Sequence, residues 1–383
     1  MIPRSATAGR TSFGPRFDAA RRRSVGGWSP SCPVHVARFT DKLGLAPHET
    51  GRAATVTASE VRAAEQAAET IGRRLRDFVF RYGLICVWAA MAIAFTVLAP
   101  GRFLTTDNLG NIFGSQAVLL VLTLGLLFPL AAGEWDLSVG STLGLSLTIV
   151  GVLNGLDHWP IWLAVLVAIL AGLVVGLVNA FFIVVADVPS LIATLGMATL
   201  LQGVAYGISN LTISGLDQTF VSLGQTSVLG IPLPFYYGIV LAFIVWYVFR
   251  WRPVGRYLFF VGSNRDVARL SGIRVPLVRT TALVTSAGIA AVAGVLMAAS
   301  LGATGPSIGP DFLLPAFAAA FLGSTTISPG RLNVWGAVVA VYFLITGITG
   351  LQLLGAPAYV QQVFYGGILV VAVALSRQAK RRS

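Results

Sequence analysis

The sequence lacks positive charge over a long central stretch, although the chain as a whole is strongly basic. It contains 27 Lys and Arg residues, yet none of them lies between Phe103 and Phe249. Only 11% of the residues are charged and 55% are hydrophobic, against about 25% charged in a typical soluble protein. Because a Lys or Arg at the centre of a bilayer costs about 2.5–3.5 kcal/mol, this gap predicts that the chain crosses a membrane many times.

Cysteine, histidine and lysine are also scarce, and this excludes several functions. The two cysteines, Cys32 and Cys86, imply no disulfide framework, and the three histidines share no metal-ligand spacing. Neither Lys42 nor Lys380 lies in a G-x-x-x-x-G-K-[ST] motif, so the chain has no P-loop for ATP hydrolysis. No catalytic constellation is present, and we expect no enzyme activity, no metal and no cofactor bound by this chain.

The basic residues that are present lie in three clusters, within residues 1–81, from Arg250 to Arg279 and from Arg377 to Arg382. Basic clusters beside apolar spans are typical of the cytoplasmic side of a membrane, and they also attract anionic membrane lipid. No aromatic-interleaved basic fold accompanies them, so nucleic acid is not an expected partner.

Hydropathy predicts an all-α polytopic membrane protein with about ten transmembrane helices, some of them short or broken. Residues 1–72 are polar and are interpreted as a disordered basic tail or an over-long predicted start, 73–377 as the transmembrane domain, and 378–383 as a basic C-terminal tail. The predicted spans are 79–99, 111–132, 137–154, 160–186, 190–209, 234–250, 280–301, 312–324, 333–353 and 359–376.

Charge independently favours an even number of spans. With both termini in the cytoplasm, all three basic clusters and Arg331 lie inside, and only Arg102 lies outside. Nine or eleven spans are possible if a short segment is re-entrant. The loop 210–233 then lies outside, where it is long enough to form a small cap.

The first segment with chemical potential is GEWDLSVG, residues 133–140, where Glu134 and Asp136 lie between apolar stretches. Acids near membrane depth are costly and face a cavity, a partner or water. They could belong to a turn beside a translocation pathway, or Asp136 or Ser138 could cap the next helix. The residues leave both interpretations open.

The second segment is the basic loop 255–273. Ser263 and Asp266 resemble a capping box, and Gly272 is placed to end a helix, which predicts a short helix at about 264–271. Val267, Leu270 and Ser271 would form a small apolar knob ringed by arginine. From spacing alone, a solvated basic loop is the favoured interpretation.

The remaining signals are weak. The hydroxyl-rich segment 322–331 is interpreted as an ordinary cytoplasmic turn. Polar residues inside spans, such as Gln116 and Asn179, more often join helices than line a path. Small-x-x-x-small pairs recur and are weak indicators of a dimer face: Gly140/Gly144, Gly172/Gly176 and Gly203/Gly207.

Taken in order, these segments resemble the permease subunits of bacterial ATP-binding-cassette importers for sugars, of the ribose, xylose and galactose type. GEWDLSVG at 133–140 is similar to the family's G-G-I-D-L-S-V-G, and GRYLFFVGSNRDVARLSGI at 255–273 to its G-R-Y…G-x-N…A-A-R-L-S-G-I. VPSLIATLG at 188–196 and GSTTISPGRLN at 323–333 also match family patterns, and the resemblance runs from about residue 79 to 376.

The resemblance implies a multi-pass protein of the bacterial inner membrane, with three kinds of protein partner: a second permease copy, identical or not, cytoplasmic ATPase subunits that hold ATP and Mg, and an external solute-binding protein. It implies that the short helix couples to the ATPase through Arg265, Asp266, Arg269, Leu270, Ser271 and Gly272. It also implies that the translocation pathway is lined by Gln116, Glu134, Asp136, Ser138 and Thr194.

The chain departs from the family pattern at several positions. Glu134 and Trp135 replace a small and an aliphatic residue, and Ser324 and Pro329 replace glycines. A Gly-Glu pair is frequent in branched-chain amino acid permeases, so a permease for those or other small solutes is an alternative to a sugar permease. An ion-coupled transporter is a third possibility, but the spans contain few acids for an ion relay.

Overall fold

The computed structural model of the chain describes residues 81–382 except residue 115. The predicted N-terminal tail 1–72 lies outside the described residues. The elements in chain order are an unlabelled helix Arg81–Leu98, α2 Thr106–Gly114, α3 Ala117–Ala131, α4 Val139–Val150, η1 Gly151–Leu156, α5 Ile161–Ala180, η2 Phe181–Val185, α6 Ser190–Ile208, β1 Ile213–Ser214, α7 Gln218–Gln225, β2 Ser227–Val228, β3 Ile231–Pro232, α8 Leu233–Trp251, α9 Pro253–Ser263, α10 Arg265–Leu270, α11 Val275–Leu301, β4 Ala303–Thr304, η3 Gly309–Phe312, α12 Leu313–Gly323, α13 Val334–Leu353 and α14 Tyr359–Arg382.

The prediction of an all-α polytopic membrane protein is confirmed. Within the described residues, 9 helices are long and apolar enough to cross a membrane, and the shorter apolar helix Gly309–Gly323 falls where the eighth span was predicted. The spans follow the predicted order, with most boundaries shifted by only one to three residues because long apolar runs are the strongest sequence signal for a membrane helix.

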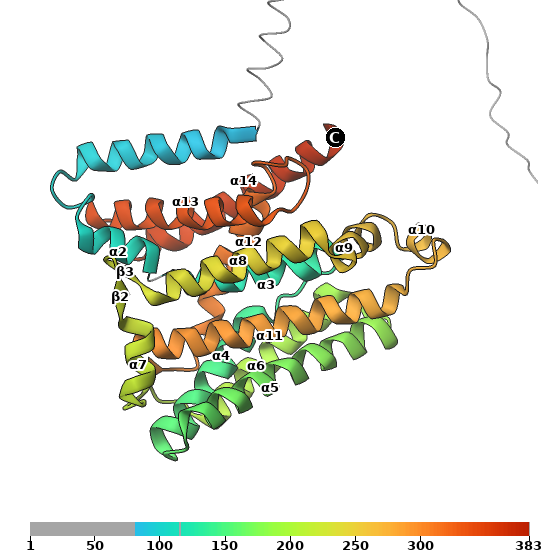
Figure 1. Cartoon of the computed structure of the whole chain (residues 1–383), viewed down its shortest axis with the longest axis horizontal. Helices are drawn as coiled ribbons and strands as arrows, with labels where there is room; N and C mark the ends of the chain where they lie inside the picture. Colours follow the sequence, from blue (N-terminus) through green and yellow to red (C-terminus); the bar gives the residue numbers. More distant parts are fainter. Residues whose placement is uncertain (1–80, 115, 383) are drawn as a thin grey trace, which may run out of the picture. The chain divides into compact units, whose positions relative to one another are not determined.

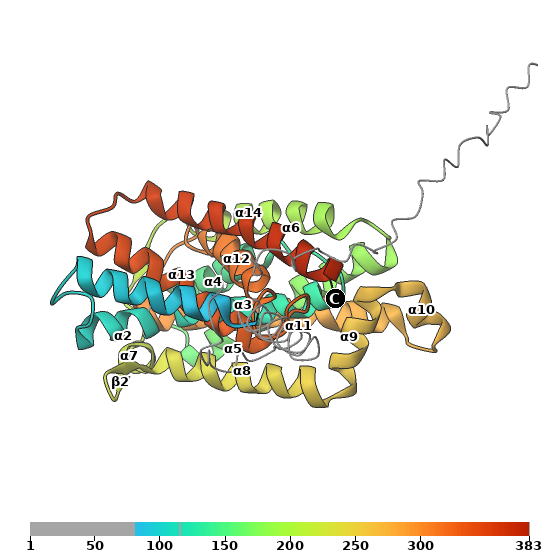
Figure 2. The ribbon, with the colours of Figure 1, turned by 90° about the horizontal axis from the view of Figure 1, so that it is seen from above.

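Helix α11 packs against α3, α4 and α5 and forms the centre of the helix bundle (Figures 1 and 2). Small residues allow these close approaches. Gly172 and Gly176 on α5 face α11, where an added Cβ would meet Ala291 and Val284 respectively. The pair Gly203/Gly207 on α6 instead faces open space.

The segment that leads into α12 enters the interior of the bundle. Gly302 ends α11 in the left-handed conformation, with φ of 63°, and the chain then reaches Gly309, which fits against Gly140 and Gly144 of α4. A Cβ on Gly309 would collide with the carbonyl oxygen of Gly140. Helix α12 therefore begins beside the middle of other helices rather than at the end of the bundle.

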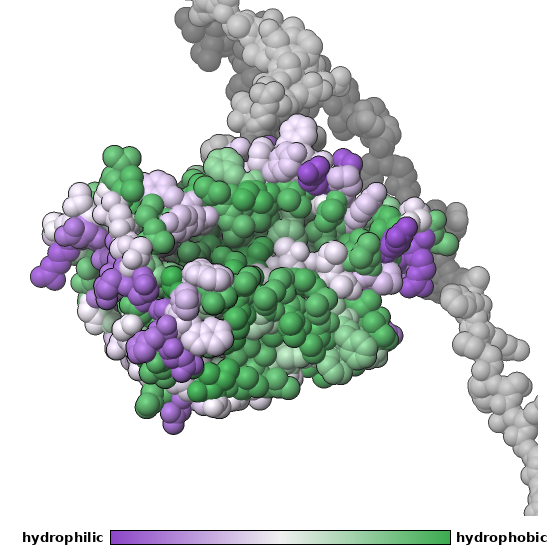
Figure 3. Space-filling view, turned by 60° about the horizontal axis from the view of Figure 1, so that its bottom comes forward, coloured by the Kyte–Doolittle hydropathy of each residue, from purple (hydrophilic) through white to green (hydrophobic). Residues whose placement is uncertain are grey.

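Contacts between connecting segments define two ends of the bundle. At one, which we call the basic end, Thr326 Oγ1 donates to the Arg81 carbonyl oxygen, Ser324 pairs with Ser376, and Arg265 contacts Glu134. Every Lys or Arg whose side chain is described lies toward this end except Arg102. Figure 3 shows a broad hydrophobic surface between hydrophilic patches, as expected of a protein in a bilayer.

At the opposite end, the segment 210–233 forms the small cap that was expected there. Strand β1 pairs with β4, and β2 pairs with β3 in a hairpin. Asp217 caps α7 by accepting hydrogen bonds from the backbone N–H groups of Thr219 and Phe220, and Gly224 packs against Ala299 at the end of α11.

Three features of the basic segments differ from the sequence predictions. The basic loop contains a second helix, α9, whose Leu258 and Val261 are buried, so its apolar face packs on the bundle. Helix α11 begins at Val275, before the predicted span start at 280. The prediction missed the first residues of the helix because they precede the purely apolar run in the sequence. Helix α14 continues to Arg382, so most of the predicted tail 378–383 is helical.

Candidate functional site: a buried acidic loop

The connection between α3 and α4, residues 132–138, forms an acidic loop that is recessed among α5, α6, α9, α10, α11 and α12. Gly133 has a φ of 78° and turns the chain at the end of α3. Gly133 faces Gly262 of α9. An added Cβ on Gly262 would collide with the carbonyl oxygen of Ala131. Two glycines therefore let α9 lie directly against the start of this loop.

Glu134 is enclosed by two arginines. Its Oε1 accepts hydrogen bonds from Arg265 Nη2, at 2.7 Å, and from Arg279 Nε. Arg279 Nη2 also donates to the carbonyl oxygen of Ile183 at 3.2 Å. The Glu134 side chain is only 2% exposed, so this carboxylate joins α10, α11 and the acidic loop in one ion-pair cluster.

Asp136 is fully buried and is satisfied by neutral donors. Its Oδ1 accepts from the backbone N–H and the hydroxyl of Ser138, at 3.1 and 2.6 Å, and its Oδ2 accepts from Ser286 Oγ at 3.0 Å. Asn179 Nδ2 in turn donates to Ser138 Oγ at 2.8 Å. Ser138, the residue before α4, makes no side-chain capping bond to the helix; the carboxylate of Asp136 accepts from the Ser138 N–H in the turn that leads into α4.

Thr194 holds the backbone of the same loop from α6. Its Oγ1 accepts from the Leu137 N–H and lies 3.1 Å from the Trp135 carbonyl oxygen, while Ser190 Oγ accepts from the Trp135 N–H. The structure thus brings together Glu134, Asp136, Ser138 and Thr194, four of the five residues that were grouped from the resemblance.

Gln116 is not part of this cluster. It lies at the beginning of α3, a helix of 15 residues, whereas the acidic loop follows its end. At about 1.5 Å per residue, roughly 22 Å separate them. Gln116 lies on the side of the bundle where Gly114 packs against Pro232 of the cap.

Trp135 points away from the ion-pair cluster. Its ring stacks on Phe317 of α12, with 5.8 Å between ring centroids, and contacts Phe321 at 5.5 Å. The Trp135 side chain remains 38% exposed. The acidic loop therefore presents one aromatic face outward beside α12 while its two carboxylates are buried.

The short helix predicted at 264–271 is present as α10, from Arg265 to Leu270. Its cap is Asn264, whose Oδ1 accepts from the N–H groups of Asp266 and Val267; the predicted cap, Ser263, is instead the last residue of α9. Gly272 ends the helix with a φ of 79°, as predicted.

The outer face of α10 carries the predicted apolar knob. Leu270 is 88% exposed and Val267 is 47% exposed, whereas Ala268 is fully buried against the bundle. Arg269, Asp266 and Ser271 surround the knob on the exposed surface. Arg265 differs from them because its guanidinium turns back toward Glu134.

Three residues of functional interest were missed from the sequence. Arg279 and Ser286 belong to α11 and contact the two acids, but they are separated from them by 145 and 150 positions in the chain. Asp311 lies in η3, the turn that leads into α12, and is exposed. The sequence feature that could have identified Arg279 and Asp311 is a charged residue next to an apolar run.

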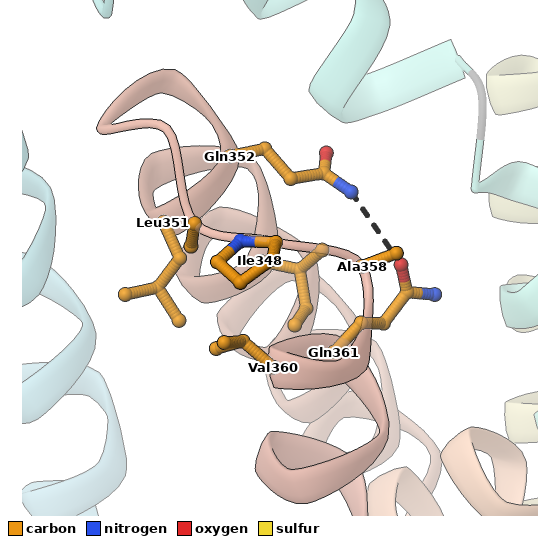
Figure 4. A pocket seen from close by; sticks show the side chains of 8 residues that line it. Ile348, Leu351, Gln352, Ala358, Val360 and Gln361 are labelled. Carbon is orange, nitrogen blue, oxygen red and sulfur yellow. Dashed lines mark hydrogen bonds between the residues drawn. The ribbon is translucent and has the colours of Figure 1, made fainter.

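A separate pocket lies between α13 and α14 near the opposite end (Figure 4). Gln352 Nε2 donates to Gln361 Oε1 at 3.4 Å across it, and the apolar lining includes Ile348, Leu351 and Val360. Within residues 81–382, no group of three His, Cys, Asp or Glu side chains could hold a metal ion.

A bundle of long apolar helices around a recessed polar loop defines a polytopic membrane protein of the transporter class. The chain belongs to the family described as branched-chain amino acid transport system / permease component, whose profile matches residues 108–373. No solved structure gives a significant match.

Curated relatives are permease proteins of several import systems. The D-allose transport system permease protein AlsC of Escherichia coli K12 is 32% identical over 300 residues, covering 78% of this chain and 91% of the relative. The ribose import permease protein RbsC of Haemophilus influenzae is 29% identical, covering 73% and 88%. The autoinducer 2 import system permease protein LsrD of Salmonella paratyphi A is 31% identical, covering 78% and 91%.

Proposed function

We propose that this chain is the membrane subunit of an ATP-driven importer and provides the path by which a monosaccharide or related polyol crosses the bacterial inner membrane. The support comes from the relatives: they include the D-allose and ribose permease proteins described above and the xylose transport system permease protein XylH of Escherichia coli K12, which is 26% identical. Although the family description names branched-chain amino acids, these relatives favour a sugar.

The other subunits of the proposed complex supply ATP hydrolysis and capture of the solute. ATPase subunits with bound ATP and Mg dock at the basic end, which faces the cytoplasm, together with both termini. A solute-binding protein delivers the sugar to the cap at the opposite end, and a second permease copy, identical or not, completes the path. The exposed Leu270 and Val267 of α10 support the docking role, because an apolar knob on a charged surface is typical of a protein contact.

The residues of the acidic loop have two roles in this proposal. Glu134, through Arg265, connects the docking helix α10 to the loop, so that a displacement of α10 moves the loop. Asp136, Ser138 and Thr194 hold the loop in the position from which it borders the path. Gln116 borders the path nearer the cap.

The first experiment is purification of tagged protein in mild detergent, with mass spectrometry of the proteins that accompany it. A stoichiometric ATPase that contains a P-loop is the expected result, followed by ATP-dependent uptake of a labelled sugar by the reconstituted complex. A lone protein that transports without ATP would instead favour an ion-coupled carrier and remove the basis for a docking role of α10.

A further inference from the structure

The start of α12 lies near the middle of the membrane. Asn179, which contacts Ser138, is about six residues before the end of the span Ile161–Val185, so Ser138 lies roughly 9 Å inside the basic end. Gly144 is about six residues further along the same helical run and lies roughly 18 Å inside. Gly309 packs against Gly144, and the hydrocarbon core is only about 30 Å thick, so η3 lies near the midplane.

Asp311 belongs to this midplane turn and is exposed. Within the described part of the chain, its carboxylate has no hydrogen bond or ion pair, and the start of α12 shows no side-chain cap. Contact with lipid tails is excluded for such a group because a charge at the bilayer centre costs several kcal/mol. An exposed acid at this depth without a partner among the described residues therefore requires water, a polar solute or a polar group of a second permease copy beside it.

An aromatic surface lies toward the basic end, on α12, the helix that follows η3. Phe317 and Phe321 of α12 stack with Trp135, whose side chain is 38% exposed. Phe317 is about six residues beyond Asp311, which places the aromatic rings roughly 9 Å further along the helix. A carboxylate followed by an exposed indole offers hydrogen-bond acceptors for hydroxyl groups and an apolar face for ring C–H groups.

We infer that Asp311 and Trp135 line the translocation path and contact the sugar in turn, Asp311 by accepting hydrogen bonds from its hydroxyl groups and Trp135 by packing against its ring. This rests on the proposed function for the identity of the solute. Trp135 packs on Phe317 and Phe321 of α12, which lie six and ten residues beyond Asp311 toward the basic end, so a solute that moves from Asp311 toward the basic end reaches the level of Trp135 next.

The first test is uptake of labelled D-allose, ribose and xylose by the complete importer with Asp311→Asn or Asp311→Glu. The Asn variant is expected to lower the uptake rate roughly tenfold or more, the range for loss of a charge-assisted hydrogen bond, while the Glu variant stays closer to the unchanged protein. Asp157→Asn makes the same chemical change at an exposed turn at the opposite end and serves as the control. Unchanged uptake by Asp311→Asn would overturn the role of the carboxylate.

Trp135 is tested in the same assay with Trp135→Leu. A clear loss of uptake is expected, and Trp162→Leu is the control because Trp162 is an exposed indole on α5, 65% exposed. Equal effects of the two substitutions would contradict a specific contact at Trp135.

The second test does not depend on the solute. In a background with Cys32→Ser and Cys86→Ser, Asp311→Cys is treated with a charged, membrane-impermeant thiol reagent. Labelling is expected at Asp311→Cys but not at Val174→Cys, since Val174 is 57% exposed in the middle of α5. Protection of Asp311→Cys would overturn the inference; labelling without uptake of any of the three sugars by the unchanged importer would leave Asp311 in the path and refute the proposed solute instead.

Discussion

At the scale of single residues, the main feature is one buried carboxylate between two guanidinium groups. The Glu134 side chain is 2% exposed, and those of Arg279 and Arg265 are 11% and 43% exposed. Because Arg279 is nearly buried, its charge depends on Glu134 for compensation, whereas water solvates part of Arg265.

We therefore expect Glu134→Gln to lower the stability of the protein strongly. Loss of one partner of a buried ion pair costs about 3–5 kcal/mol, and here it would also leave two arginines facing each other. Thermal unfolding of the purified protein in detergent measures the effect. Arg265→Ala is the comparison, with an expected cost of at most about 1 kcal/mol because this side chain is partly solvated.

A double substitution, Glu134→Leu with Arg279→Met, checks the cause. It removes both buried charges and keeps apolar volume, so it should recover much of the stability lost in Glu134→Gln. If the double variant is less stable than Glu134→Gln, the buried charge of Arg279 is not the origin of the loss.

The sequence predicted these residues only in part. Glu134 and Asp136 were evident because acids are rare beside apolar runs. Their partners were not, since Arg279 and Ser286 come from a distant helix and their pairing depends on tertiary packing. The sequence interpretation placed Glu134 on the path, and this stays a prediction; the structure adds that its carboxylate contacts two arginines.

At the scale of elements, α10 and α12 show different limits of prediction. A capping signal, assigned to Ser263 although Asn264 is the cap, and Gly272 together located α10 to within one residue because these signals are local. The adjacent α9 was missed, since its 11 residues mix arginine with a short apolar face. The span of α12 was located, but its depth depends on the contact of Gly309 with α4, which no local pattern reveals.

Leu270→Asp is expected to uncouple ATP hydrolysis from uptake while the protein still inserts into the membrane. A charge on a buried contact residue can cost 2 kcal/mol or more, about thirtyfold in docking affinity. Co-purified ATPase and the ratio of sugar taken up to ATP hydrolysed measure the effect. Leu229→Asp is the matched control because Leu229 is 93% exposed in the hairpin at the opposite end. Full coupling in Leu270→Asp would refute the docking role of α10.

Gly309→Ala is expected to destabilise the protein by about 1–3 kcal/mol or more, the usual cost of overpacking. The added methyl group would collide with the backbone of α4 at Gly140 and Gly144, which cannot move aside as a flexible side chain can. Gly305→Ala provides the control, since its methyl group would meet only ordinary contacts at 3.7 Å. Similar melting temperatures for both variants would show that α12 does not depend on this close approach.

At the scale of the whole molecule, hydropathy and charge predicted more of the arrangement of the spans than they predicted of the contacts within the candidate site. The positions of the spans follow from the cost of placing charge in hydrocarbon, which acts on every span alike, and the gathering of basic residues at one end follows the bias of Lys and Arg toward the cytoplasmic side of a membrane. How the recessed loop, the midplane turn and the docking helix meet was beyond these signals. It depends on which helices become neighbours, and that is set by contacts between small residues far apart in the chain.

Arginine is concentrated at one end of the bundle, and trypsin cleaves after Lys and Arg. The sizes of tryptic fragments therefore depend on the orientation of the chain in the membrane. Phe103–Arg250 would survive a complete tryptic digest as one uninterrupted fragment that carries the acidic loop and Thr194. In sealed vesicles, trypsin on the side of the basic end should release this fragment still joined to the first helix, by cutting after Arg250. Trypsin on the other side should cut only after Arg102, so the fragment sizes from intact cells and from inverted vesicles would directly show which end faces the cytoplasm.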